Sequence, residues 1–293
     1  MGYILLVIAA VLNTTKSYCS KRVSNKVEAA SDAVDVALAR NLVCASIGAA
    51  LLLISGVQNF YMPSGGWLIC IISGISIGLN YAVWLLALKV GVFMLLGAVS
   101  SASFLIAVVS GVMFFGEVFT IKKGIAMILM CIAIVCMGRY QIRLKQRLGF
   151  VQILLLFLVF LTAGFTSVTQ KWFTRTLPTV SAHTFSFYSI VFSVVFLALF
   201  SLFLPKTESI GKRCVNLKPH VLLILIMAAC FYGVTYFQTS ASLSLEAIVM
   251  YPLYNGMVLA AESSMAWLCF SEKPDRNSII GVLLTFVAII LSR

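Results

Sequence analysis

Residues 245–270 read LEAIVMYPLYNGMVLAAESSMAWLCF and decide the fold class of the chain. This apolar run is 26 residues long, which is enough to cross a bilayer as a tilted helix. Pro252, Asn255 and Glu262 interrupt it, and lipid can satisfy none of them. Asn255 and Glu262 are seven residues apart, so two helical turns place them on one face. We expect that face, which includes Tyr251, to look at protein or trapped water.

Glu262 allows two interpretations. In the first, its carboxyl is structural, stays protonated and hydrogen-bonds a neighbouring helix. In the second, it lines a substrate path and carries a coupling proton. An acidic side chain at the centre of a membrane helix costs on the order of 3 kcal/mol on insertion scales and is usually functional. We therefore favour a role in the path and keep proton coupling as a separate hypothesis.

The composition is that of a multi-pass membrane protein. Of the 293 residues, 61% are hydrophobic and 10% are charged, whereas soluble domains are about 25% charged. The net charge of +12 comes from Lys and Arg between hydrophobic runs, where they orient the protein and contact anionic lipid. We therefore expect membrane lipid as a partner and no nucleic acid.

Ten hydrophobic runs follow one another, mostly joined by short connections. They are residues 2–20, 34–57, 67–88, 90–115, 121–138, 150–171, 181–204, 219–242, 245–270 and 278–291. The sequence therefore predicts an all-α membrane protein with ten transmembrane helices.

An internal repeat organises these runs. Residues 78–117 align with residues 233–272 without a gap, at a constant offset of 155. The alignment pairs Tyr81 with Tyr236 and Glu117 with Glu272. We expect two five-helix repeats, residues 1–140 and 148–293. Because each repeat has an odd number of spans, the second must insert upside down, which predicts an inverted repeat with a site near the membrane midplane.

Each predicted repeat ends its fourth helix in a glutamate, within FFGE at 114–117 and CFSE at 269–272, and a short helix follows near Gly124 or Gly281. Three further positions fit the same pattern: Lys21, Arg40 and Pro252. The pattern resembles the EamA-type branch of the drug/metabolite transporter superfamily. The resemblance implies a secondary transporter, an exporter of a small metabolite or drug-like solute, that works by alternating access. We assign both glutamates to helix capping or boundary ion pairs beside nearby lysines.

Polar and aromatic residues on other helices are further candidates for a solute path. Asn80, Tyr81 and Trp84 lie close together in the third run, and Tyr232 and Tyr236 lie in the eighth. Rings with polar tips suit a pocket for an amphipathic or cationic solute. Ordinary packing and interfacial placement explain them equally well.

We expect the following residues to line the path: Asn80, Tyr81, Trp84, Tyr232, Tyr236, Tyr251, Asn255 and Glu262. Glu262 is the candidate for proton coupling, with Lys16 as its buried partner. Lys16 could instead extend to the interface from the end of its helix. Uncoupled uniport or exchange of an amino acid, sugar or nucleotide sugar is an alternative function. A channel or a non-transporting scaffold is an alternative of another class.

Catalytic motifs are missing from the sequence. The two histidines, His183 and His220, have no carboxylate or thiol at motif spacing, and the eight cysteines show no metal-ligand spacing. We therefore expect no enzyme activity, cofactor or metal, and a monomer or homodimer in the plasma (inner) membrane. More Lys and Arg fall on the side opposite the termini, which predicts external termini, whereas the family resemblance implies cytosolic ones.

Overall fold

The computed structural model describes residues 2–24, 29–56, 60–90, 93–143, 149–204, 220–270 and 276–291. This part of the chain consists of helices and connecting segments and contains no strand. Its helices are α1 (Gly2–Ser24), α2 (Ala30–Ser55), α3 (Ser64–Val90), α4 (Phe93–Ala102), α5 (Phe104–Phe115), α6 (Ile121–Arg143), α7 (Phe150–Thr176), α8 (Ala182–Phe203), α10 (Val221–Ser244), α11 (Ala247–Phe270) and α12 (Arg276–Leu291).

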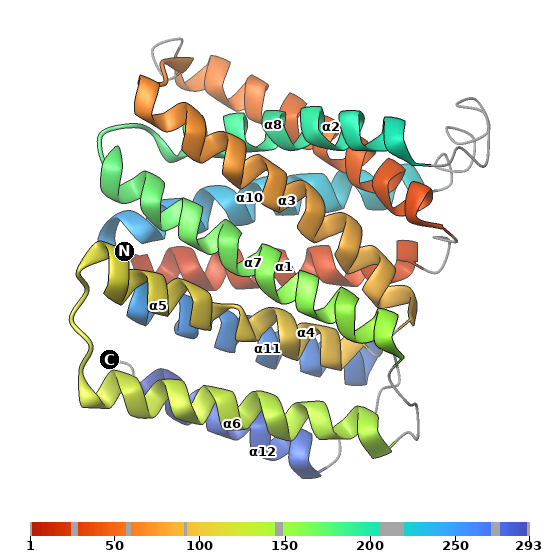
Figure 1. Ribbon diagram of the computed structural model, residues 1–293, viewed down its shortest axis with the longest axis vertical. Coiled ribbons are helices and arrows are strands. Elements are labelled where there is room, and N and C mark those ends of the chain that lie inside the picture. The colour runs from red at the N-terminus through yellow and green to blue at the C-terminus, as the bar shows by residue number, and fades with distance from the viewer. Residues whose placement is uncertain are drawn as a thin grey trace.

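The helices lie side by side in one bundle (Figure 1). α2 packs on α8 at one edge, and α6 packs on α12 at the opposite edge. Between these edges, α1 packs on α10 and α3 packs on α7. α11 contacts α1, α4 and α5 and is therefore surrounded by other helices. α1 begins at the end of the bundle where α12 ends (Figure 1).

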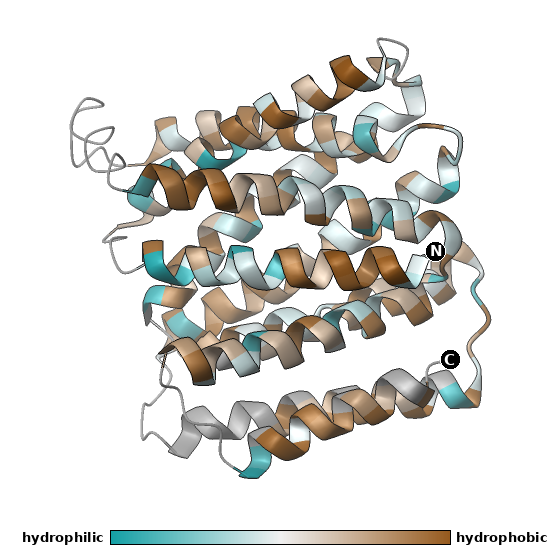
Figure 2. Cartoon of the chain, turned by 180° about the vertical axis from the view of Figure 1, so that it is seen from behind, coloured by the Kyte–Doolittle hydropathy of each residue, from teal (hydrophilic) through white to brown (hydrophobic). Residues whose placement is uncertain are grey.

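Seven segments of the described part are long and apolar enough to span a membrane, and one of them, Leu95–Phe115, runs from α4 through α5. Large apolar side chains such as Phe157, Leu199 and Leu222 are exposed on the outside of the bundle, as expected for contact with lipid. Figure 2 shows hydrophobic residues along the middle of the helices and hydrophilic residues at several helix ends. The protein is therefore an all-helical, integral, multi-pass membrane protein.

α11 is not among these seven segments, although residues 245–270 were predicted to be long enough to cross the bilayer. Its polar residues lower its mean hydropathy, and its side chains are mostly buried against other helices: Tyr251, Asn255 and Glu262 are all buried. A helix enclosed by protein need not be apolar all round, because its polar groups can find partners in neighbouring helices.

The fourth hydrophobic run forms two helices instead of one. α4 ends at Ala102 and α5 begins at Phe104. At the break, Ser103 N–H donates to the Ser100 carbonyl and Ile106 N–H donates to the Ser103 carbonyl, both at 3.1 Å. These bonds reach back three residues instead of four, so the helix tightens locally. Broken helices of this kind are tolerated in membranes where they line a cavity.

We predict that Gly74→Ala destabilises the bundle by about 1–3 kcal/mol, because inserting an atom into a packed interface forces the backbones apart. A Cβ at Gly74 of α3 would lie 2.7 Å from the Ser189 carbonyl oxygen and 2.8 Å from the Ser193 nitrogen of α8. Gly65→Ala, in the first turn of α3, is the control, since its Cβ would meet nothing within 4 Å. The melting temperatures of the two purified variants test this, and equal values would contradict it.

Candidate functional site

A cavity of about 120 Å³ lies inside the bundle, with room for several water molecules. Seven helices contribute to its wall: α1, α2, α3, α4, α7, α10 and α11. Its charged lining residues are Lys16, Arg40 and Glu262. Carboxamides, hydroxyls and aromatic rings complete a wall in which polar and apolar groups alternate. The cavity therefore has the properties of a hydrated binding site, and the helices around it are apolar on their outer faces.

Glu262 of α11 lies in this wall and is held by α1. Its Oε1 accepts hydrogen bonds from Ser17 Oγ at 2.6 Å and from Asn13 Nδ2 at 3.4 Å. Its Oε2 lies against Gly97 of α4, where a Cβ would come within 2.7 Å of that oxygen. The absence of a side chain at position 97 therefore makes room for the carboxyl group.

Lys16 lines the cavity one turn from Asn13 on α1. Its Nζ donates to Asn13 Oδ1 at 2.7 Å, and the same carboxamide donates to Glu262. Asn13 thus bridges the ammonium group and the carboxyl group. Lys16 points into the bundle and does not extend to the helix end.

Arg40 of α2 is 1% exposed although it carries a charge. Its guanidinium carbon lies 3.4 Å from the ring centroid of Tyr81 and 4.2 Å from that of Phe231. Its Nε and Nη2 donate to Asn41 Oδ1 at 2.9 and 2.7 Å. Stacking and bidentate hydrogen bonding of this kind hold a buried guanidinium in place.

Three further residues of the expected path line the same cavity. Asn80 Nδ2 donates to Thr162 Oγ1 of α7 at 3.0 Å, and Asn255 Nδ2 donates to the Tyr251 carbonyl at 2.9 Å. The indole Nε1 of Trp84 is buried and has no hydrogen-bond partner among the described residues. The cavity thus gathers Asn80, Tyr81, Trp84, Asn255, Glu262 and Lys16 from the expected set.

Three tyrosines of that set lie away from the cavity wall. Tyr236 stacks on His183 of α8 with ring centroids 3.9 Å apart, and Tyr232 OH lies 3.1 Å from His183 Nδ1. Tyr251 OH donates to the Ser167 carbonyl at 2.6 Å. We expected these tyrosines in the path because of their spacing along the helices. Spacing alone does not tell which neighbour a helix face contacts, and the face of α10 that bears Tyr232 and Tyr236 packs towards α8.

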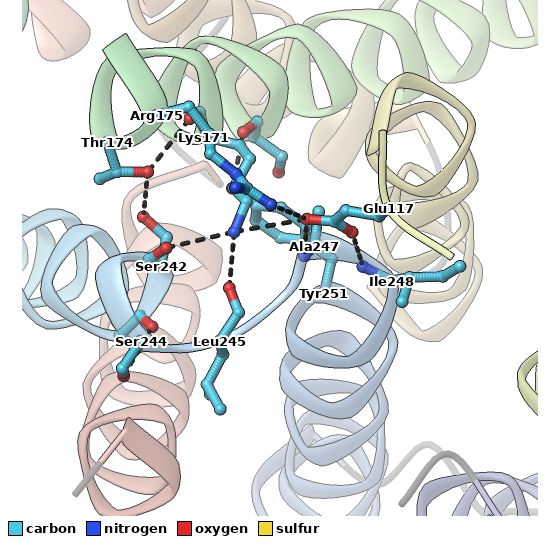
Figure 3. Close-up of polar contacts among 12 residues, drawn as sticks. Glu117, Lys171, Thr174, Arg175, Ser242, Ser244, Leu245, Ala247, Ile248 and Tyr251 are labelled. Carbon is cyan, nitrogen blue, oxygen red and sulfur yellow. Dashed lines mark hydrogen bonds and ion pairs between the residues drawn. The ribbon is translucent and has the colours of Figure 1, made fainter. Parts of the chain in front are cut away.

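A second polar cluster lies at the end of the bundle where α1 begins (Figure 3). Glu117 Oε1 and Oε2 accept hydrogen bonds from the Ala247 and Ile248 amides at 2.8 and 2.9 Å, which caps the start of α11. Lys171 Nζ lies 3.4 Å from Glu117 Oε1 and donates to the Leu245 carbonyl at 2.6 Å. We call Glu117, Lys171 and the first turn of α11 the end cluster.

The local sequence positions Glu117 for this role. Gly116 ends α5 with a φ of 63°, a left-handed conformation that glycine adopts readily. The following Glu117 N–H donates to the Gly111 carbonyl at 3.1 Å. The turn directs the carboxylate back across the bundle to α7 and α11. Glu117 caps a helix and pairs with a lysine, but the helix, α11, and the lysine, Lys171, are distant in sequence and are not the nearby partners that we expected. Glu272 lies outside the described residues.

Comparisons with known proteins agree with this description. The model of the EamA-like transporter family matches residues 1–139. A solved structure titled "Crystal structure of protein" superposes with a TM-score of 0.67 at 13% identity, covering 99% of this chain and 95% of that chain. At this identity the likeness concerns the fold alone. No curated protein matches the chain.

The family match confirms the resemblance drawn from the glutamate pattern. It also agrees with the apolar helices and with the polar cavity that they enclose. Residues 1–139, just under half of the chain, are therefore similar to the EamA-like transporter family, and the apolar helices make the protein an integral, multi-pass membrane protein.

Proposed function

We propose that the protein is a secondary transporter that exports a small metabolite or drug-like solute by alternating access. The observation that carries the proposal is the polar cavity, with Lys16, Arg40 and Glu262 in its wall, inside helices whose outer faces are apolar. Such a cavity suits a solute that must leave water to cross the bilayer. Export is the direction implied by the family.

Contacts between the helices close the bundle between the cavity and the end cluster, which supports a state in which a solute cannot leave at that end. The Tyr251 hydroxyl bonds to α7 at Ser167, which lines the cavity. One turn further along α7, Gln170 Nε2 donates to Thr239 Oγ1 of α10 at 2.9 Å. The end cluster then joins α5, α7, α10 and α11. These successive contacts would have to separate for a solute to leave at this end.

Two inverted repeats, residues 1–140 and 148–293, remain our prediction for the architecture. The helix packing supports it: α1 packs on α10, and the predicted repeat mates of these helices, α7 and α3, also pack on each other. The offset of 155 also pairs Lys16 with Lys171. Lys16 donates to Asn13 in the cavity wall, while Lys171 pairs with Glu117 in the end cluster.

We predict saturable counterflow of solute in liposomes. Solutes that raise the melting temperature of the purified protein are found in a metabolite library, since only ligands that prefer the folded state do so, and are then tested for exchange. Trp84→Ala should slow exchange roughly tenfold or more, because it removes a large contact surface from the cavity. Trp67→Ala is the matched control, since Trp67 packs edge-to-face on Tyr188 and is not a lining residue.

The same assay separates the other functions. A channel would give flux without saturation or counterflow, and a scaffold would give no flux above that of protein-free liposomes. Either result would contradict a secondary transporter. Equal loss in the two tryptophan variants would contradict the placement of the solute in the cavity.

A further inference from the structure

Two of the aromatic rings that line the cavity, those of Tyr81 and Phe231, are occupied by the protein's own cations. The guanidinium of Arg40 lies 3.4 Å from the ring centroid of Tyr81 and 4.2 Å from that of Phe231, and Lys16 Nζ lies 5.6 Å from the same Phe231 centroid. A cationic solute would need free ring faces for cation–π contacts. Here those contacts already hold two positive groups next to the cavity, so a solute cation would meet like charges instead.

The charges of the wall do not balance. Among the lining residues, Lys16 and Arg40 face a single acid, Glu262. That acid already accepts hydrogen bonds from Ser17 and Asn13. With all three groups ionised, the wall carries one positive charge that no lining residue compensates. An uncompensated charge enclosed within the apolar bundle is unfavourable even beside a few water molecules, and a bound anion would remove this imbalance.

Two donors of the wall, the Trp84 indole and the Lys16 ammonium, have hydrogens that no described residue accepts. The Trp84 indole N–H, on a side chain that is 7% exposed, has no acceptor among the described residues. The Lys16 ammonium has three hydrogens, of which one is donated to Asn13. A solute that supplies acceptor oxygens would satisfy both groups.

We propose that the transported solute is a small organic monoanion whose carboxylate lies against Lys16, Arg40 and Trp84. This inference rests on the proposed function, because it takes the cavity to be the solute site. A single charge follows from the single uncompensated cation. A phosphomonoester carries about −1.5 to −2 charges near neutral pH and would overcompensate the wall.

A consequence concerns Glu262. As the pH falls and this carboxyl takes up a proton, the wall loses its one negative charge and attracts an anion more strongly. The titratable groups that interact with Glu262 are Lys16 and Tyr254; Lys16 in turn interacts with Arg40 and Cys230, and Arg40 with Tyr81. Glu262→Gln should therefore tighten binding of the monoanion in alkaline buffer, whereas Arg40→Met and Lys16→Met should weaken it. A purely structural role predicts loss in all three variants.

The test measures the melting temperature of the purified full-length protein against a charge-matched panel. The panel contains monocarboxylates from acetate to phenylacetate, the amide and the amine of each skeleton, and dicarboxylates from malonate to phthalate. We expect stabilisation by monocarboxylates and little by the amides, amines or dicarboxylates. If amines or amides stabilise the protein and monocarboxylates do not, the proposal that the solute is a monoanion is wrong, whereas the proposed transport function still stands. No stabilisation by any class would count against both proposals.

Variants then locate the effect. Arg40→Met and Lys16→Met should each weaken monocarboxylate affinity about tenfold or more, which is the usual effect of losing a charge-assisted hydrogen bond. Arg22→Met is the matched control, because Arg22 stacks on Tyr18 at 5.3 Å but is not a lining residue. If Arg40→Met fails to fold, Arg40→Lys keeps the charge and should retain part of the affinity. Equal effects of Arg40→Met and Arg22→Met would overturn the proposal.

Discussion

Replacing Glu117 by alanine is expected to lower the free energy of unfolding by about 3–5 kcal/mol, the usual cost of removing one partner from a buried ion pair. The side chains of Glu117 and Lys171 are 0% and 4% exposed. Without the carboxylate, the Lys171 ammonium keeps its carbonyl acceptors but loses its counter-charge. The Ala247 and Ile248 amides at the start of α11 also lose their acceptors.

Arg175 provides the control for this prediction. Its Nη2 approaches the same Oε1 of Glu117 at 3.8 Å, but its side chain is 50% exposed. Water screens such a pair, so Arg175→Ala should cost less than about 1 kcal/mol. Urea or thermal unfolding in one detergent compares the two variants. Equal losses would mean that the end cluster is not a buried ion pair, and a neutral Glu117→Ala would show that it does not hold the bundle together.

Replacing Glu262 by glutamine is expected to abolish proton-driven solute accumulation. One pH unit corresponds to about 1.4 kcal/mol, so a one-unit gradient can sustain roughly a tenfold solute gradient for each coupled proton. Glutamine can still accept the Ser17 hydrogen bond but cannot release a proton. Exchange without a pH gradient should therefore persist in Glu262→Gln, while accumulation falls to the level seen without the gradient.

Asp32→Asn makes the same acid-to-amide change outside the cavity, where Asp32 accepts a hydrogen bond from the Ala29 amide at 3.0 Å. This variant should accumulate solute like the unchanged protein. Protein-free liposomes correct for passive entry of the solute. If accumulation survives in Glu262→Gln, Glu262 carries no coupling proton, although it could still bind the solute. If exchange is lost as well, the carboxylate is needed for the path itself.

Hydropathy alone located the helices of this protein. Over the described residues, nine of the ten hydrophobic runs each correspond to one helix, because long apolar segments in lipid must satisfy their backbone hydrogen bonds internally. The run 90–115 was the exception in detail, since it forms two helices with a break at Ser103. The break has no glycine or proline, and a serine within an apolar run does not predict a helix break, so the sequence did not reveal it.

The cavity was harder to derive, because it depends on which helices meet. Glu262 and Lys16 were noticed since charges within apolar runs are unusual. The same signal was present at Arg40, which was not placed among the expected lining residues, although its guanidinium lies between the rings of Tyr81 and Phe231 in the structure. The partners of Glu117 could not be inferred, because Lys171 and α11 reach it through tertiary packing.

Gly97 limits how the site can vary among relatives. A methyl group at this position would lie 2.7 Å from Glu262 Oε2, and Ser17 holds the other carboxylate oxygen at 2.6 Å. The two positions should therefore change together in evolution. Chains that keep a glutamate on the ninth hydrophobic run should keep a glycine on the fourth, and chains with alanine there should carry aspartate or a neutral residue instead.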